Sequence, residues 1–392
     1  MGESARLEVD VPADHGAVDV LDVGADWVEV APHDYAEDTY PNIWYWFGVR
    51  NVGPSPQAAH RALAPARIVL SGLFAGADRI YVPFWSMSLW SRDGQSWERV
   101  PAEHQTVLDD RVEFRAHLAP GERVWIAETF PLSWQHCREL MENLPEIAEP
   151  GFEVERLCLG GSEQGRPVLA ARVSDGKPRP ALVLIGGQHA VEESGKIFCE
   201  TALQWLIEQR GSPEVRDILS RYEVFVAPEV NPDGCYDGRM NTNARGVIMD
   251  SPQDDSVEMR NQLRLVDQVR PRILVNCHGW GNAIGKPPYE GWYRWRDDDP
   301  FFDHVVSRVP GAATSTDRRR RTAHFLDGAF RLESYVREKF GAHAGRCAAC
   351  GMLEINWNFY VRPDGSVVQP TYDDLRARSI EYLRAIATMP LD

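Results

Sequence analysis

The spacing of hydrophobic residues changes near residue 150 of this 392-residue chain. Before that point, short apolar–polar alternations run from Ala17 to Val23, Trp44 to Asn51 and Arg111 to Leu118, with turn residues between them. Short alternating strands at such intervals are typical of an antiparallel sandwich. We therefore expect an N-terminal antiparallel β-sandwich, with the aromatic residues between Tyr40 and Trp97 packed mainly in its core.

After residue 150, apolar runs alternate with stretches of helical periodicity. Helices are expected at 192–209, 213–221, 256–268, 329–340 and 372–387. Strands separated by helices indicate a mixed or parallel sheet that is covered on both faces. The chain is therefore expected to form two domains, a β-sandwich over residues 1–148 and an α/β domain with a mixed sheet flanked by helices over residues 149–392.

One stretch of the second part combines an apolar run with residues that can bind a metal. The run Ala181 to Ile185 ends at two glycines, and His189 and Glu192 follow where a helical pattern begins. This order predicts a buried parallel strand, a turn and a helix. An imidazole and a carboxylate three residues apart can converge on one cation. A catalytic zinc site needs a third protein ligand.

His278 is the candidate for that third ligand. It lies near the end of a second apolar run, RILVNCHGW, from Arg272 to Trp280. Binding sites in open α/β sheets form at the carboxyl ends of strands, so residues from two such ends can meet in space. The sequence therefore predicts that His189, Glu192 and His278 bind one Zn²⁺ ion.

Two further motifs accompany these residues. VAPEVNPDG runs from Val226 to Gly234, and GMLEINW runs from Gly351 to Trp357. With the HxxE motif and the strand-end His-Gly pair, they resemble the M14 zinc carboxypeptidases, and within them the cytosolic carboxypeptidase-like branch. The resemblance implies a carboxypeptidase-like fold and zinc-dependent hydrolysis of a peptide or amide bond. It also implies that Glu354 is the catalytic base, which deprotonates water and passes the proton to the leaving amine.

The chain departs from the family pattern shortly after NPDG. Asn241 stands where the family has an arginine that polarises the scissile carbonyl. Arg239 and Arg245 flank this position, and either could reach into the gap or lie in solvent. These three residues are therefore candidates for substrate binding.

A second departure affects the expected grip on the substrate. Asp250 and Ser251 replace the Asn-Arg pair that holds the terminal carboxylate in the family, and Ile248 replaces an aspartate that orients a zinc histidine. A guanidinium fork for a carboxylate is missing at that place. We therefore expect altered specificity, with Asp250 and Ser251 as substrate-binding candidates.

Three interpretations of this loss remain open. A nearby cation, such as Arg245, Lys286 or one of Arg318 to Arg321, could replace the anchor. The leaving group could instead lack a free carboxylate and carry an amine that Asp250 attracts, which would make the protein an amidase or a specialised peptidase. Asp250 could alternatively orient His189, as ligand histidines usually require.

Charge and hydropathy limit the partners. The formal net charge of −16 disfavours nucleic-acid binding. The four arginines from Arg318 to Arg321 could favour an acidic substrate or form a solvated loop. No apolar run approaches the ~18 residues that span a bilayer, and no signal pattern stands at the start, so we expect a cytoplasmic protein without membrane contact. Seven scattered cysteines are expected as reduced thiols.

Other classes of function stay open. The substrate is expected to be a peptide or an amino-acid conjugate, which includes an amidase or deacylase. A pseudoenzyme that binds an acidic peptide without cutting it is the non-enzymatic alternative. Loss of the clamp favours it, whereas retention of His189, Glu192, His278 and Glu354 opposes it. The sequence does not determine an oligomeric state.

Overall fold

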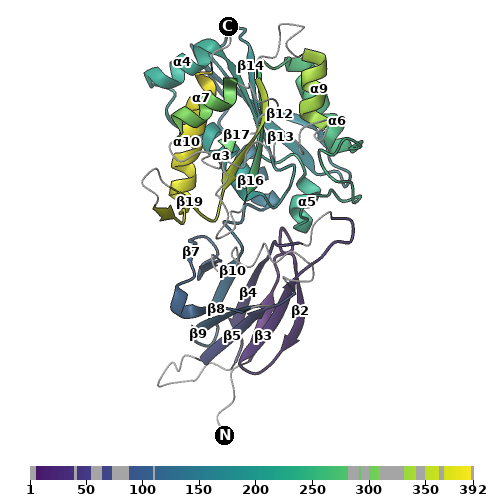
Figure 1. Ribbon diagram of the computed structural model, residues 1–392, viewed down its shortest axis with the longest axis vertical. Coiled ribbons are helices and arrows are strands. Elements are labelled where there is room, and N and C mark those ends of the chain that lie inside the picture. The colour runs from purple at the N-terminus through teal and green to yellow at the C-terminus, as the bar shows by residue number, and fades with distance from the viewer. Residues whose placement is uncertain are drawn as a thin grey trace. The chain divides into compact units, whose positions relative to one another are not determined.

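The computed structural model describes residues 6–38, 42–53, 64–72, 88–108, 111–280, 291–292, 300–309, 331–340, 349–361 and 366–389. The chain forms two compact units, one of Met1–Pro131 with Tyr236–Met240, the other of Leu132–Cys235 with Asn241–Asp392 (Figure 1). Lys286 and Arg318 to Arg321, which the sequence analysis named, lie outside the described residues. The domain boundary after residue 148 stays a prediction.

The first unit is built from strands. They are β1 (Leu7–Asp10), β2 (Val18–Val23), β3 (Trp27–Pro32), β4 (Trp46–Asn51), β5 (Ala64–Leu70), β6 (Leu89–Ser91), β7 (Glu98–Arg99), β8 (Gln105–Val107), β9 (Val112–Leu118) and β10 (Arg123–Ala127), with a short 3-10 helix at Ala102–His104. One sheet has the order β1-β4-β10-β6-β7 and the other β2-β3-β5-β9-β8. Antiparallel pairing is confirmed, except that β3 and β5 pair parallel. The packing of the two sheets as a sandwich stays a prediction.

A short segment from the later part of the chain completes the first unit. The main-chain N–H of His15 donates to the carbonyl of Tyr236 at 2.7 Å. The side-chain amide of Asn42 donates to the carbonyl of Gly238 at 3.0 Å. Tyr236–Met240 therefore belongs to this unit, although about a hundred residues of the second unit precede it.

The second unit contains an eight-stranded mixed sheet. Its strands are β11 (Ile147–Glu149), β12 (Phe152–Gly161), β13 (Pro167–Ser174), β14 (Ala181–Gly186), β15 (Glu223–Ala227), β16 (Ile273–Trp280), β17 (Gly291–Trp292) and β18 (Ala349–Asn356), in the order β11-β12-β13-β15-β14-β16-β18-β17. The strands β15, β14, β16 and β18 pair parallel, and the outer pairings are antiparallel. The predicted mixed sheet is confirmed. A separate hairpin pairs β19 (Tyr360–Val361) with β20 (Val367–Val368).

Helices cover both faces of this sheet, as Figure 1 shows. They are α2 (Trp134–Glu142), α3 (Glu193–Glu208), α4 (Pro213–Arg221), α5 (Pro232–Asp237), α6 (Val257–Val269), α7 (Pro300–Arg308), α9 (Arg331–Phe340) and α10 (Tyr372–Ala387). The five predicted helices match α3, α4, α6, α9 and α10 within two residues at each end. No described helix is long and apolar enough to span a bilayer.

Local sequence explains where three of these helices begin. Ser212 and Ser256 accept hydrogen bonds from the N–H groups of Val215 and Met259, three residues into α4 and α6. Such N-caps satisfy a donor that the helix itself leaves unpaired. The side chain of Thr371 does the same for α10 in a capping box with Asp374.

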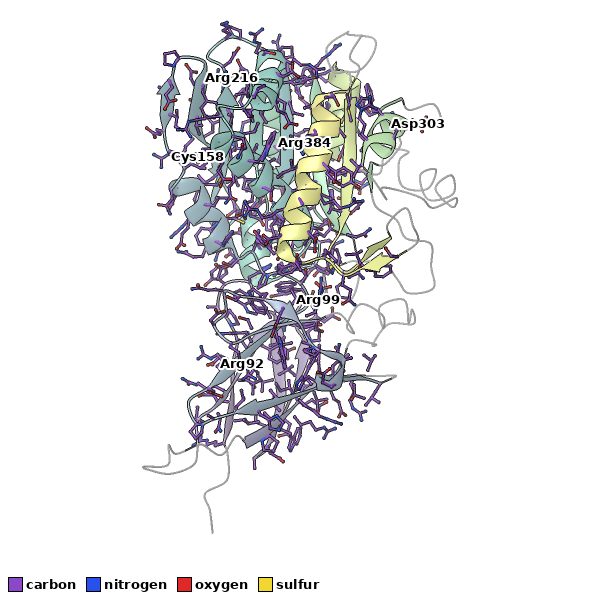
Figure 2. The ribbon with its side chains drawn as sticks, turned by 90° about the vertical axis from the view of Figure 1, so that its left-hand side faces the viewer. Arg92, Arg99, Cys158, Arg216, Asp303 and Arg384 are labelled. Atoms are coloured by element: carbon purple, nitrogen blue, oxygen red, sulfur yellow. The ribbon has the colours of Figure 1, made fainter. Side chains whose placement is uncertain are left out.

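The last helix is also held from outside. Arg384 of α10, labelled in Figure 2, forms a two-point ion pair with Glu214 of α4, with N–O distances of 2.6 and 2.9 Å. Paired hydrogen bonds of this kind fix the orientation of both side chains. The ion pair therefore ties the start of α4 to the C-terminal part of the chain.

The central strands carry the core and align the chemically important residues. All six residues of β14 are buried, which explains its uninterrupted apolar sequence. In the parallel pairing of β16 with β18, His278 lies opposite Glu354. Residues opposite each other in neighbouring strands point to the same face of a sheet. The register therefore brings these two side chains together.

The main chain of helix α3 packs directly against the main chain of β16 at Gly195. A Cβ atom added at Gly195 would be 2.3 Å from the carbonyl oxygen of Cys277 and 3.0 Å from the main-chain nitrogen of His278. Only glycine permits this approach. It fixes the start of α3, and with it Glu192, next to the strand that carries His278.

We expect Gly195→Ala to destabilise the second unit. Alanine in a helix normally gains about 1 kcal/mol over glycine, but the clash with Cys277 costs roughly 1–3 kcal/mol or more. Urea unfolding followed by helical circular dichroism measures the difference. Gly211→Ala, where nothing lies within 4 Å of the added Cβ, is the control. Equal stability of Gly195→Ala and wild type would contradict the contact.

Candidate metal centre

The structure brings the three predicted ligands together at one edge of the mixed sheet. His189 lies in the turn that follows β14, Glu192 is the N-cap residue of α3, and His278 lies near the end of β16. Their nitrogen and oxygen donor atoms all lie within 4.8 Å of one another. Three residues from two distant stretches of the chain therefore enclose one small volume.

The carboxylate of Glu192 lies between the two imidazoles. The Nδ1 atom of His189 is 2.9 Å from Oε1, and the Nδ1 atom of His278 is 2.7 Å from Oε2. The main-chain N–H of Gly279 also donates to Oε2, at 3.2 Å. The two rings are nearly perpendicular, with centroids 4.8 Å apart. These contacts orient all three side chains toward one another.

Burial and charge determine the state of Glu192. Burial raises the pKa of this carboxyl, but the attraction of His189 and His278 and their hydrogen bonds outweigh it and lower the pKa to about 2. The side chain is therefore an anion at neutral pH. A buried anion between two imidazoles is a strong donor for a divalent cation.

These residues fit a zinc ion. Two imidazole nitrogens and one carboxylate oxygen form a known ligand set of catalytic zinc sites. Donors ~2.1 Å from one zinc ion lie ~3.4 Å from each other in tetrahedral geometry. Here the two Nδ1–Oε separations are 2.9 and 2.7 Å, and all the donor atoms lie within 4.8 Å of one another. The Nε2 atom of His278 is buried and has no hydrogen-bond partner among the described residues. Nε2 is the ring nitrogen that does not contact Glu192, so the fit to zinc rests on the two Nδ1 atoms.

Glu354 lies beside the three ligands. It is in the middle of β18, opposite His278, and 5 % exposed. Its Oε2 atom has no hydrogen-bond partner in the part of the chain that the structure describes. Burial, and then the negative charge of Glu192, raise its pKa well above the usual value. A carboxylate with a raised pKa is a better proton acceptor.

Ser194 and Gly279 support this arrangement, although the sequence analysis did not single them out for it. The hydroxyl of Ser194 donates to the carbonyl of Ile355 at 2.6 Å, next to Glu354. A Cβ atom at Gly279 would lie 2.4 Å from that hydroxyl. The signal in the sequence was a small residue shortly after two of the candidate ligands, Gly279 directly after His278 and Ser194 two positions after Glu192, and it was too common to interpret.

Asp250 does not face solvent. It is 1 % exposed and accepts hydrogen bonds from the main chain of Leu332 at 2.8 Å and from the side chain of Asn276 at 3.1 Å. Ser251 is partly buried. Among the described residues, no hydrogen bond or ion pair joins Asp250 or Ser251 to the three ligands or to Glu354.

The two candidate arginines have other partners. Arg245 is half exposed and forms an ion pair with Glu163 at 3.0 Å. Arg239 belongs to the first unit, where it lies 3.1 Å from Asp237 and its guanidinium stacks over Tyr35.

Asn241 is buried in the second unit. It is 5 % exposed, and its main-chain carbonyl accepts a hydrogen bond from Met249 at 2.9 Å. This bond closes the loop that carries Ile248, which is one of the exposed large hydrophobic residues. The described contacts of Asn241 therefore hold the loop together.

Three buried polar residues near the ligands were missed by the sequence analysis. Gln188 precedes His189, Asn276 precedes His278 by two positions, and Glu333 lies in the first turn of α9. The side chain of Asn276 donates to Gln188 at 2.5 Å and to Glu333 at 2.7 Å. A carboxamide within an apolar strand is costly to bury without partners, and that was the available signal.

Part of the chain is similar to known zinc carboxypeptidases. Residues 141–279 match the family model Peptidase_M14, described as zinc carboxypeptidase. An uncharacterized protein of Zymomonas mobilis, ZMO1242, is 23 % identical over 281 residues, which cover 70 % of this chain and 67 % of that protein. The inactive metallocarboxypeptidase ecm14 of Talaromyces marneffei is 27 % identical over 115 residues, 27 % of this chain and 18 % of that protein.

The fold is also found in solved structures. A metallo-carboxypeptidase from Burkholderia cenocepacia aligns with a TM-score of 0.73 and 17 % identity, covering 97 % of this chain and 98 % of that one. At this identity the likeness concerns the fold alone. It extends over both units of the chain.

We expect His278→Ala to weaken zinc binding by ~100-fold or more. Loss of a residue that only hydrogen-bonds to a metal ligand costs ~10–100-fold in affinity, and this substitution removes a ligand itself. Competition with a chelating dye measures the affinity. His136→Ala is the control, because that imidazole also pairs with a glutamate, Glu200, at 2.9 Å but lies outside the centre. Equal affinity of His278→Ala and wild type would contradict the site.

Proposed function

Because this chain belongs to the M14 family of zinc carboxypeptidases, we propose that it is a zinc-dependent hydrolase of peptide or amide bonds. Within the family we assign it to the cytosolic carboxypeptidase-like branch. The observation that carries the proposal is the convergence of His189, Glu192 and His278 on one volume, with the buried carboxyl of Glu354 beside it.

Each protein group has a role in the proposed reaction. A zinc ion held by His189, Glu192 and His278 supplies Lewis acidity, which lowers the pKa of water and polarises a carbonyl. Glu354 takes a proton from the attacking water and passes it to the leaving nitrogen. Its raised pKa and its unpaired Oε2 atom suit both steps.

The proposed specificity differs from that of a carboxypeptidase with an Asn-Arg clamp. Asp250 occupies the position of the asparagine, and its contacts direct it into the protein interior. Ser251, at the position of the arginine, has no cationic group. We therefore propose that this loop does not hold a terminal carboxylate. The burial of Asp250 also argues against its attracting an amine of the leaving group.

The substrate is then a peptide or amino-acid conjugate that is recognised by other groups. An amide whose leaving group lacks a free carboxylate fits this site best, which would make the protein an amidase or deacylase. Asn241 is our candidate for a neutral donor to the carbonyl oxygen in place of the family's arginine. Arg245 is engaged with Glu163, and its recruitment to substrate would require breaking that ion pair.

A non-catalytic binding function is the second candidate. Asn241 lacks the charge that stabilises a developing oxyanion, and one relative with a similar sequence is named an inactive metallocarboxypeptidase. The retained Glu354 favours catalysis, because a buried carboxyl whose Oε2 atom has no hydrogen-bond partner among the described residues is costly for a protein that only binds.

We expect Glu354→Gln to lower kcat/KM for an amide substrate by ~10²–10⁴-fold while zinc stays bound in equal amount, because the substitution removes only the proton acceptor. Steady-state kinetics and metal analysis of the same preparation measure both quantities. Glu208→Gln, an exposed residue of α3, is the control. Equal turnover of wild type and Glu354→Gln would support the binding function instead.

We also expect poor release of C-terminal residues from ordinary apolar peptides, and less than ~10-fold discrimination between a peptide and its C-terminal amide, because the paired hydrogen bonds of a guanidinium fork are missing. Mass spectrometry of matched peptide pairs measures the release. Efficient release that prefers the free acid and persists in Arg245→Ala would contradict the proposed specificity.

A further inference from the structure

A cluster of buried polar side chains lies behind the metal centre. Asp250, Asn276 and Glu333 are each at most 1 % exposed, as is Gln188. The amide nitrogen of Asn276 lies 2.5 Å from Oε1 of Gln188, 2.7 Å from Oε1 of Glu333 and 3.1 Å from Oδ2 of Asp250. Four elements of the second unit therefore meet at one amide group.

The hydrogen atoms of this amide are too few for its neighbours. An asparagine amide carries two N–H bonds, whereas three oxygen acceptors lie within hydrogen-bond distance of Asn276. The Oε2 atom of Glu333 also has no partner among the described residues. The cluster is therefore short of donors. One additional proton on a carboxyl group would supply the missing donor.

The charges in the cluster require the same proton. The carboxyls of Asp250 and Glu333 are in hydrogen-bond contact, and burial, followed by the charge of Glu333, raises the pKa of Asp250 well above its usual value. Asp254 is a third carboxylate, which accepts from the main-chain N–H of Asp250 at 2.9 Å. Two carboxylates in contact and away from water do not both ionise.

In the part of the chain that the structure describes, the other groups that face the pair do not neutralise it. The first turn of α9 directs the main-chain N–H of Leu332 at Asp250. Asn276 of β16 and Gln188 after β14 are neutral, as is Gln262 of α6, which accepts from Gln188 at 2.6 Å. The thiol of Cys350 lies against the carbonyl of Glu333. None of these side chains is a cation.

We propose that Asp250 and Glu333 share one proton, and that this pair positions the two histidine ligands through Asn276 and Gln188. Asn276 and His278 are two residues apart in β16, so their side chains lie on the same face. Gln188 is adjacent to His189, and its carbonyl accepts from Asn231 of the NPDG motif at 3.1 Å. The inference rests on the proposed metal site but not on its turnover.

The backbone of Asp250 suits this role. Its φ of 59° is in the left-handed region, which is uncommon for residues other than glycine and costs ~1–3 kcal/mol unless the surroundings hold it. Its carbonyl accepts from Arg331 at 3.0 Å and its side chain from Leu332. Asp250 therefore fastens the loop after NPDG to the start of α9.

The shared proton makes the cluster sensitive to pH. A carboxyl with a higher pKa in the folded state holds a proton that unfolding releases. Its contribution to stability is complete below about pH 4 and is lost as the pH rises toward the folded-state pKa. Replacing one carboxyl by its amide keeps the shape and a donor but removes this release of a proton.

The first experiment measures urea unfolding of the metal-free protein between about pH 5 and pH 8. Release of one proton on unfolding raises the equilibrium constant of unfolding ~10-fold per pH unit. We expect this additional rise in wild type and not in Glu333→Gln or Asp250→Asn. Glu338→Gln, an exposed residue of the same helix, should behave as wild type. Equal slopes in wild type and both amide variants would overturn the shared proton.

The second experiment measures zinc affinity at pH 7. Asn276→Ala removes the donor that links the pair to Gln188, so zinc should bind ~10–100-fold more weakly. Asn261→Ala, which removes a buried amide that donates to Gly161 at 2.9 Å, is the control. Unchanged affinity in Asn276→Ala would overturn the positioning role.

If Asn276→Ala does not fold, Glu333→Gln decides the positioning role. Glu333→Gln keeps the hydrogen bonds and should retain the wild-type affinity for zinc at pH 7, yet exceed it at higher pH, once the wild-type pair has lost its shared proton. Identical pH profiles of zinc affinity would refute the link between the pair and the ligands. Neither experiment measures hydrolysis, so a failure of the proposed function is distinguishable from a failure of this inference.

Discussion

The in-register parallel pairing of β14, β16 and β18 is the constraint on which the rest of the second unit depends. It ends all three strands at the same edge, so His189, His278 and Glu354 reach one place although 165 residues separate the first from the last. Hydrogen bonds of the backbone set this register. Side chains then decide only what the edge can bind. The approach of α3 to β16 at Gly195 adds Glu192 by the same means, main chain against main chain.

Burial of acidic groups has opposite results at two neighbouring places. Glu192 is stabilised as an anion because two imidazoles contact it, whereas burial and the charge of Glu333 raise the pKa of Asp250, which no cation among the described residues contacts. The difference follows from partners and not from depth, since all three are nearly inaccessible to water. A fixed anion suits a metal ligand. A proton-bearing pair suits a support that must not compete for the metal.

Much of this arrangement could be predicted from the sequence. The helices α4 and α10 matched the limits predicted from their periodicity, and serine or threonine N-caps mark their starts. The ligands could be grouped because each follows an apolar strand. The burial of the Asp250 side chain could not be predicted, because its partners Leu332 and Glu333 come some eighty residues later in the sequence. The place of Arg239 in the first unit could not be predicted either, because local sequence does not reveal which unit a loop residue joins.

The segment Tyr236–Met240 belongs to the first unit, although it lies within the stretch of sequence that forms the second. It leaves the second unit directly after the NPDG motif, contributes to the first unit, and returns at Asn241. The polypeptide therefore crosses between the units three times, and no single cut separates them. A fragment that begins at residue 132 would carry this segment without its hydrogen-bonding partners His15 and Asn42. The first unit is therefore not encoded by one continuous stretch of the chain.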